Sequence, residues 1–194
     1  MRWTKLIAAA ALMMLALTPF LPPAQEAQTE PEPTETPKPN PRPETWTRYE
    51  VGLRDDLQRY VQRLCREYGV APCVVLAMIE IESRGTFRAN IEGDGGDSIG
   101  LMQIQPQWHE KRMRDLGVTD LKDPEQNILV GIDFLAELLE ITQGDYDTSL
   151  SFYNSGSATG GRDYAHAVLC RSEQILEGSM IEIVRRGAIG HGKV

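Results

Sequence analysis

The segment from Pro72 to Glu82 is apolar on nearly every side of a helix, and it constrains the fold more than any other part of the sequence. A helix at the surface keeps one polar face, so a helix without one is expected at the centre of a domain. Val75, Met78 and Glu82 follow one another at i, i+3 and i+7, along one line of this helix. We therefore expect the Glu82 carboxyl to lie beside core-facing groups, where desolvation raises its pKa.

Helical periodicity continues on both sides of this segment, and no hairpin signal is strong, so the predicted fold class is mainly α. Glycines crowd the stretch 84–100, which we expect to be a long loop of the kind that carries function. The helices predicted from apolar spacing and capping residues are 53–68, ending at Gly69; 72–82; 108–116; one that opens at Asp123-Pro124; 148–153; and 164–177.

The first 47 residues are predicted to contain a targeting segment followed by a linker. A basic start precedes an apolar run of signal-peptide length at 6–17. Its continuation nearly reaches the length of a spanning helix, so residues 1–27 are predicted to be either a cleaved signal peptide or an N-terminal membrane anchor. Residues 28–47, rich in proline, glutamate and threonine, predict an extended linker. A single domain is expected over 48–194, outside the membrane.

Charge and motif content exclude several classes of function. A net charge of −8 argues against a nucleic-acid partner, which would need a basic face. His109, His166 and His191 lack the close spacing of zinc ligands, and the stretch Asp94 to Asp97 has too few ligands for calcium and reads as a solvated turn. Nucleotide-binding motifs are absent. We therefore expect no metal and no cofactor.

Three cysteines, Cys65, Cys73 and Cys170, leave two readings open. One disulfide and one free thiol would suit an oxidising compartment. The favoured reading is that these residues are buried as small apolar side chains, because the spacing singles out no pair.

Five short motifs occur in order along the chain. They are Glu-Ser at 82–83, Gly-Leu-Met-Gln-Ile at 100–104, Asp-Pro-Glu-Gln-Asn-Ile at 123–128, Phe-Tyr-Asn-Ser-Gly at 152–156 and Asp-Tyr-Ala-His-Ala-Val at 163–168. Together they resemble the soluble lytic transglycosylase family, which is related to the goose-type lysozymes. The resemblance extends over residues 50–175.

The resemblance implies a lysozyme-like helical domain with a substrate groove. It implies a peptidoglycan lytic transglycosylase that cleaves the β-1,4 bond between N-acetylmuramic acid and N-acetylglucosamine and leaves a 1,6-anhydro end. Glu82 would act as general acid and then as general base. Glycan strands of peptidoglycan would be the partner of a monomeric enzyme that is secreted, or anchored facing the cell wall.

Further site residues are implied by the same motifs. Tyr164 would hydrogen-bond near Glu82 and belong to the substrate-binding residues, while Ser98 and Asn154 would contact the N-acetyl group and the backbone of the sugar. Read singly, each side chain has an ordinary structural explanation as core packing, a helix cap or a turn, and only their joint order favours a site. The lining of the groove would include Met102, Gln103 and Tyr153.

Two other functions stay open at this stage. A hydrolysing lysozyme of the same fold would add water instead of forming the anhydro ring. A wall-binding module without turnover would keep the groove, although such a module has no need of a carboxyl with a raised pKa.

Overall fold

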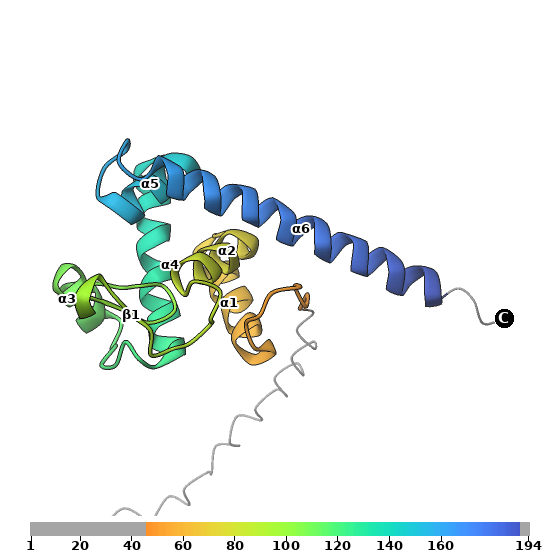
Figure 1. Cartoon of the computed structure of the whole chain (residues 1–194), viewed down its shortest axis with the longest axis horizontal. Coiled ribbons are helices and arrows are strands. Elements are labelled where there is room, and N and C mark those ends of the chain that lie inside the picture. The colour runs from red at the N-terminus through yellow and green to blue at the C-terminus, as the bar shows by residue number, and fades with distance from the viewer. Residues whose placement is uncertain (1–45, 191–194) are drawn as a thin grey trace, which may run out of the picture. The chain divides into compact units, whose positions relative to one another are not determined.

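The computed structural model describes residues 46–190, with side chains described as far as residue 182 (Figure 1). The predicted signal or anchor segment lies outside these residues, as does nearly all of the predicted linker. The mainly α fold class is confirmed. The elements are α1 (Asp55–Tyr68), α2 (Pro72–Glu82), β1 (Glu92–Gly93), the 3-10 turn η1 (Asp94–Gly96), β2 (Ser98–Ile99), α3 (Pro106–Asp115), α4 (Pro124–Ile141), α5 (Tyr146–Ser155) and α6 (Arg162–Gly190).

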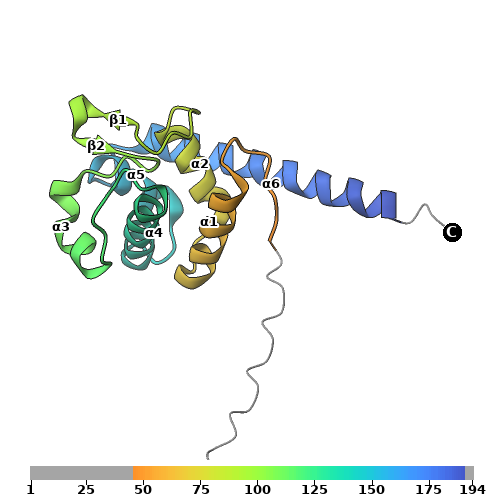
Figure 2. The same ribbon diagram turned by 90° about the horizontal axis from the view of Figure 1, so that it is seen from below.

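Helix α2 lies at the centre of the core, as its composition predicts. Five successive residues, Val75 to Ile79, are completely buried. The helix packs against α1 and α6, and both views show it beside them (Figures 1 and 2). Pro72 is the first residue of the helix, where a missing N–H costs nothing, and Glu82 is the last.

Helix α4 forms the other half of the core. It contacts α1, α3 and α5, and Figure 2 looks nearly along it, with α1 and α3 on opposite sides. Its start follows the prediction: the Asp123 carboxylate accepts a hydrogen bond of 2.8 Å from the Gln126 N–H, and Pro124 occupies the first turn. Ile128, Ile132 and Leu135 are completely buried.

The glycine-rich stretch differs from the predicted loop, because it contains a small antiparallel hairpin. Glu92 pairs with Ile99 and Gly93 with Ser98, around the turn η1. Strands of two residues are too short to show an alternating pattern, which is why the sequence carried no hairpin signal.

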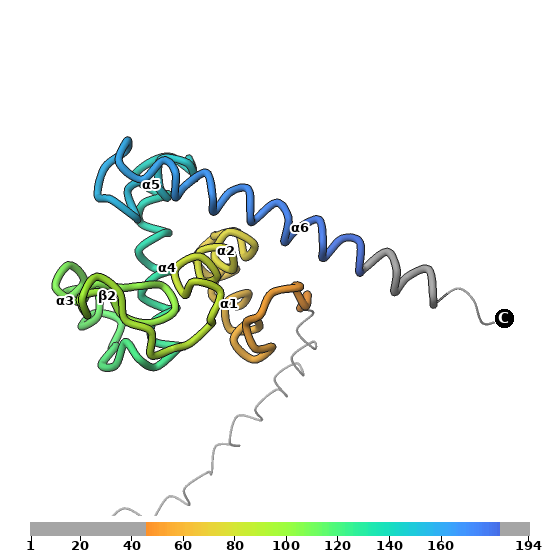
Figure 3. Tube along the Cα trace, in the orientation of Figure 1, coloured from red at the N-terminus to blue at the C-terminus, as the bar shows by residue number. Residues whose placement is uncertain are grey.

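Helix α6 continues to Gly190, well past the predicted end near residue 177. It is the long helix that follows α5 in the tube of Figure 3. Apolar periodicity reports burial, and Leu176, Met180 and Ile181 are exposed, so the pattern fades before the helix does. Within the part of the chain that the structure covers, no helix combines the length and the hydropathy needed to cross a membrane.

The cysteines are free thiols in the described residues. Cys65 and Cys73 are buried and serve as small core side chains, as predicted. For Cys170 that prediction is wrong: it lies on the exposed side of α6, with its sulfur 3.1 Å from Nδ1 of His166.

The buried amide of Asn127 joins the Gly-Leu-Met-Gln segment to α4. Its Oδ1 accepts a hydrogen bond of 2.8 Å from the Met102 N–H, and its Nδ2 donates to the carbonyls of Ile99 (2.8 Å) and Leu121 (3.1 Å). Gly100 has φ +79°, and a Cβ there would come within 2.3 Å of the Asn127 amide. One side chain therefore satisfies three backbone groups and requires glycine at the turn it holds.

Replacing Asn127 should destabilise the fold strongly. In Asn127→Ala the Met102 N–H and the Leu121 carbonyl lose this buried partner, while the Ile99 carbonyl keeps its bond from the Ile104 N–H, and the free energy of unfolding should fall by about 3 kcal/mol. Urea unfolding of the full chain measures this change. Asn154→Ala, which removes the same amide from an exposed position, should change it by less than about 0.5 kcal/mol. Equal effects of the two substitutions would contradict this role for Asn127.

Candidate active site

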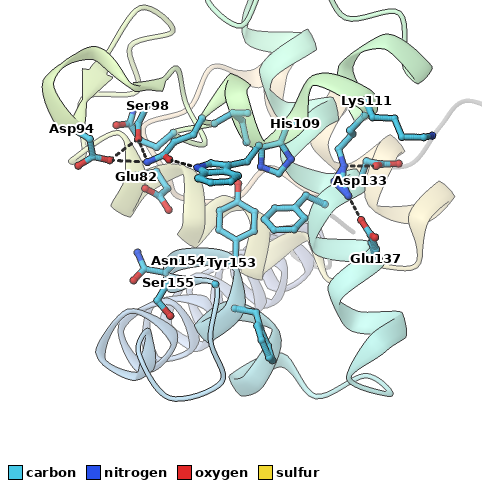
Figure 4. Close-up of a pocket in the computed structure, with 18 of the residues that line it drawn as sticks. Glu82, Asp94, Ser98, His109, Lys111, Asp133, Glu137, Tyr153, Asn154 and Ser155 are labelled. Carbon is cyan, nitrogen blue, oxygen red and sulfur yellow. Dashed lines mark hydrogen bonds and ion pairs between the residues drawn. The ribbon is translucent and has the colours of Figure 1, made fainter.

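A groove of about 1170 Å³ runs across the domain, and Glu82 lies in its wall (Figure 4). In the close-up, the Glu82 carboxyl lies between Asp94 and Ser98 on one side and Asn154 on the other. Helices α2, α3, α4 and α5, the turn η1 and the strand β2 all contribute to the lining, so the groove exists only in the folded domain. Its lining includes Ile81, Glu82, Arg84, Asp94, Ser98, Gln103, Ile104, Gln105, Trp108, His109, Arg112, Asp133, Phe134, Glu137, Phe152, Tyr153, Asn154 and Ser155.

Glu82 ends the apolar helix α2 and turns its carboxyl into the groove. Burial raises the pKa of this carboxyl to about 7, an effect opposed by Tyr164 and reinforced by the negative charge of Asp94. A pKa near neutrality is what a general acid needs in order to hold and release a proton in neutral solution. The raised pKa expected from the position of Glu82 on the helix is therefore present.

The turn after Glu82 is organised by Ser83, the second residue of the Glu-Ser motif. Ser83 is completely buried, and its hydroxyl accepts a hydrogen bond of 3.1 Å from the Phe87 N–H. Its carbonyl accepts one of 2.6 Å from the Thr86 hydroxyl. These bonds end the helix at a defined residue and so hold the Glu82 backbone at the groove.

Glu80, the neighbouring carboxylate on α2, faces another way. Both of its oxygens accept hydrogen bonds from the Arg171 guanidinium of α6, at 3.0 to 3.2 Å. This ion pair holds α6 against α2 on the side away from the groove lining. Of the two glutamates at the end of α2, only Glu82 belongs to the groove.

Tyr164 is buried next to Glu82 and is not part of the groove lining. Its pKa is raised well above its ordinary value by burial first and then by the charge of Glu82. Among the described residues its hydroxyl makes no hydrogen bond of standard geometry. Its interaction with Glu82 is therefore weaker than a standard hydrogen bond. The predicted proximity to Glu82 is present, and the substrate contact predicted for Tyr164 stays a prediction.

The Gly-Leu-Met-Gln segment is a tight turn closed by a pair of hydrogen bonds between Ile99 and Ile104, each 2.9 Å. Gln103 has φ +47° and lines the groove, where its Nε2 donates to the Gly100 carbonyl at 2.9 Å. Met102 was expected in the lining, but the structure places it elsewhere. Its side chain is completely buried against α4, where a Cβ on Gly131 would lie 2.4 Å from its sulfur.

Tyr153 joins this turn to α5. Its hydroxyl donates a hydrogen bond of 3.1 Å to the Met102 carbonyl. Met102 therefore contributes to the site through its backbone, not through its side chain. The Tyr153 ring lies in the groove lining, 5.1 Å from the ring of Phe134. The position predicted for Tyr153 therefore agrees with the structure.

Ser98 and Asn154 line the groove on opposite sides of Glu82. Ser98 is only 2% exposed, and its hydroxyl donates to the Asp94 carboxylate at 2.6 Å. Asn154 is exposed on α5. The structure brings both next to the carboxyl, while their contacts with a sugar stay a prediction.

Several lining residues escaped the analysis of the sequence. Asp94 had been read as a solvated turn residue, yet it lies in the groove and accepts hydrogen bonds from Ser98 and from Gln105, the latter at 3.3 Å. Trp108 and Phe134 carry no motif that distinguishes a groove aromatic from a core aromatic.

His109, also in the lining, is not an alternative acid. Burial and the nearby charge of Arg112 lower its pKa to about 4, so the ring is neutral in neutral solution. It packs edge-on against Phe134, with ring centroids 4.6 Å apart. Within the described part of the chain, no three His, Cys, Asp or Glu side chains are grouped to hold a metal ion.

Comparisons with known proteins show which proteins this chain is similar to. The family model described as the transglycosylase SLT domain matches residues 59–167. The transglycosylase of Enterobacteria phage PRD1 is 35% identical over 91 residues, which cover 47% of this chain and 31% of the phage protein. The chain therefore matches less than a third of the length of this relative.

Solved structures of lytic transglycosylases are also similar. An inactive mutant of the lytic transglycosylase Slt from Pseudomonas aeruginosa has a TM-score of 0.46 and 18% identity, over 63% of this chain and 22% of that chain. The 70 kDa soluble lytic transglycosylase from Escherichia coli has a TM-score of 0.45 and 21% identity, over 59% of this chain and 18% of that chain.

The pKa of Glu82 has a consequence for stability. Because the folded pKa of about 7 lies above the ordinary 4.5, the folded state binds this proton more tightly than the unfolded state. The free energy of unfolding therefore loses a contribution as pH rises from about 4.5 to about 7. Glu82→Gln removes this titration, so its stability relative to the native protein should increase by up to about 3 kcal/mol over that range.

Urea unfolding at closely spaced pH values tests this expectation. Glu140→Gln, which neutralises an exposed glutamate on α4, is the matched control and should follow the native pH profile. A stability difference between Glu82→Gln and the native protein that does not change with pH would show that the carboxyl is not desolvated.

Proposed function

Since the chain belongs to the transglycosylase SLT domain family, whose model matches residues 59–167, we propose that it is a lytic transglycosylase of peptidoglycan with Glu82 as its acid and base. The observation that carries the proposal is the Glu82 carboxyl, half-buried at the end of α2 and open to a groove. The proposed place of action is outside the cytoplasm, where peptidoglycan lies.

In the first step, the protonated Glu82 carboxyl gives its proton to the oxygen of the bond between N-acetylmuramic acid and N-acetylglucosamine. The C1–O bond breaks, and the leaving sugar departs with a neutral hydroxyl. Positive charge develops at C1, and the substrate's own N-acetyl group stabilises it. A pKa of about 7 leaves much of this carboxyl protonated in neutral solution, which supports this role.

In the second step, Glu82 is a carboxylate and takes the proton of the 6-hydroxyl of N-acetylmuramic acid. The oxygen attacks C1 and closes the 1,6-anhydro ring, and the carboxyl is protonated again for the next cycle. No water is consumed. The negative charge of Asp94, which favours the protonated form of Glu82, supports the return of this proton.

The groove suits a saccharide chain. Its volume of about 1170 Å³ is slightly larger than that of ordinary ligand pockets, and its lining combines polar and aromatic side chains. Ser98, Gln103 and Asn154 present hydroxyl and amide groups beside the acid, as recognition of N-acetyl and hydroxyl groups requires.

A hydrolysing lysozyme of the same fold is the second candidate, and Asp94 is the observation in its favour. Glycosidases that use water need a second carboxylate near the acid, and Asp94 lies across the groove from Asn154, close enough to shift the pKa of Glu82. Its carboxylate already accepts hydrogen bonds from Ser98 and Gln105, which favours a structural role. The products of the reaction distinguish the two mechanisms.

Digestion of purified murein followed by mass spectrometry tests the proposed function. The native protein should release fragments with 1,6-anhydro ends, and Glu82→Gln should lower the rate by about 10²–10⁴, because the proton donor is lost while the shape of the side chain is kept. Glu140→Gln should retain the native rate. Reducing ends heavier by one water would favour the hydrolase, and binding of murein without release of fragments would contradict both enzymes.

The dependence of activity on pH tests the environment of Glu82. Activity should fall as pH rises through about 7, because the acid loses its proton. Tyr164 lowers this pKa, so Tyr164→Phe should move the falling limb to higher pH. The control Tyr60→Phe alters a half-buried tyrosine of α1 that does not line the groove, and its limb should stay in place. If activity falls at the same pH in Tyr164→Phe as in the native protein, the interaction between Tyr164 and Glu82 is refuted.

A further inference from the structure

Trp108 presents an unusual surface to the groove. It lies in the first turn of α3 and lines the groove, yet it is 77% exposed, more than any other large apolar side chain in the described residues. Exposing most of an indole leaves a large area of hydrophobic stabilisation unused. A side chain of this size in the wall of a groove is an apolar face available to a ligand.

The indole is also held in orientation. Its Nε1 donates a hydrogen bond of 3.1 Å to Oε1 of Gln105. Nε2 of Gln105 donates in turn to the Ser98 hydroxyl at 3.1 Å and to the Asp94 carboxylate at 3.3 Å. Ser98 donates to the same carboxylate. The exposed ring is therefore anchored by its polar edge while its faces stay open.

This network connects the indole to the place of chemistry. Asp94 and Ser98 flank the Glu82 carboxyl in Figure 4, and Gln105 carries their hydrogen bonds to Trp108. A ligand that spans the groove would thus meet the acid and the indole together. Such a ligand needs polar groups beside Glu82 and an apolar face over Trp108.

We propose that Trp108 is the stacking platform of a saccharide subsite in this groove, and that Gln105 is its positioning residue. The apolar C–H face of an N-acetylhexosamine ring would lie on the indole, while its N-acetyl and hydroxyl groups face the polar wall. This inference rests on the proposed function for the nature of the ligand. An uncharged sugar ring combines these two surfaces, because its C–H face suits the open indole and its hydroxyl and N-acetyl groups suit the polar side chains in the same lining.

Binding of a neutral probe tests the subsite without turnover. The probe is the β-1,4-linked tetrasaccharide of N-acetylglucosamine, titrated calorimetrically into the full chain carrying Glu82→Gln. Adding Trp108→Ala to this parent should weaken binding about tenfold or more, as truncation of an anchoring aromatic does. Trp108→Phe keeps an aromatic face but loses the hydrogen bond from the indole Nε1 to Gln105. Gln105→Met keeps the indole and loses the same hydrogen bond. Each substitution should weaken binding about threefold.

Trp46→Phe is the matched control. Trp46 stacks on Arg59 of α1 with 4.2 Å between the guanidinium carbon and the ring centroid, outside the groove lining, and its replacement should leave binding unchanged. Tryptophan fluorescence should change on binding in the parent and in Trp46→Phe, but not in Trp108→Phe. Because Trp108 is exposed, its variants should unfold at the same urea concentration as the parent.

The outcomes separate this inference from the proposed function. Binding by Trp108→Ala within twofold of the parent, or no binding of the tetrasaccharide by the parent, would overturn the subsite. If the native protein releases no fragments from murein while binding still depends on Trp108, the proposed function fails and the subsite stands.

Discussion

The side-chain amide of Asn127 is the contact on which the arrangement of the groove depends. It binds three backbone groups of the chain around the Gly-Leu-Met-Gln turn, and it does so from a completely buried position on α4. An unpaired backbone group in such a place would be costly, so the turn has one low-energy position relative to α4. Because the same turn presents Gln103 and receives the Tyr153 hydroxyl, one interaction positions two walls of the groove.

The raised pKa of Glu82, the proposed acid, comes from packing rather than from a dedicated partner. Helix α2 is surrounded by apolar side chains until its last turn, and Glu82 takes its raised pKa mainly from that burial. Keeping a carboxyl in such a place lowers the stability of the fold in neutral solution. The ion pair between Glu80 and Arg171, on the opposite side of the helix, helps α2 keep its place despite this cost.

The parts that could be predicted from the sequence are those governed by neighbouring residues. The limits of α2, the cap at Asp123 and the end of α1 at Gly69 follow from side-chain periodicity and capping chemistry within a few residues. The hairpin of β1 and β2 was missed because its strands are too short to show a pattern. The far end of α6 was missed because periodicity reports burial, and the helix continues where burial has ended.

The candidate site divides in the same way. Glu82 could be predicted from its position along an apolar helix only together with the ordered motifs that follow it, since helical spacing decides which residues share a face but does not by itself mark a site. The placement of Met102, Asp94 and Trp108 could not, because it depends on contacts between segments that are distant in the chain. Met102 is buried by Gly131 of α4, and Asp94 is brought to Glu82 by the hairpin. Helical spacing and the order of the motifs thus predicted the proposed acid, and long-range packing alone decided which side chains surround it.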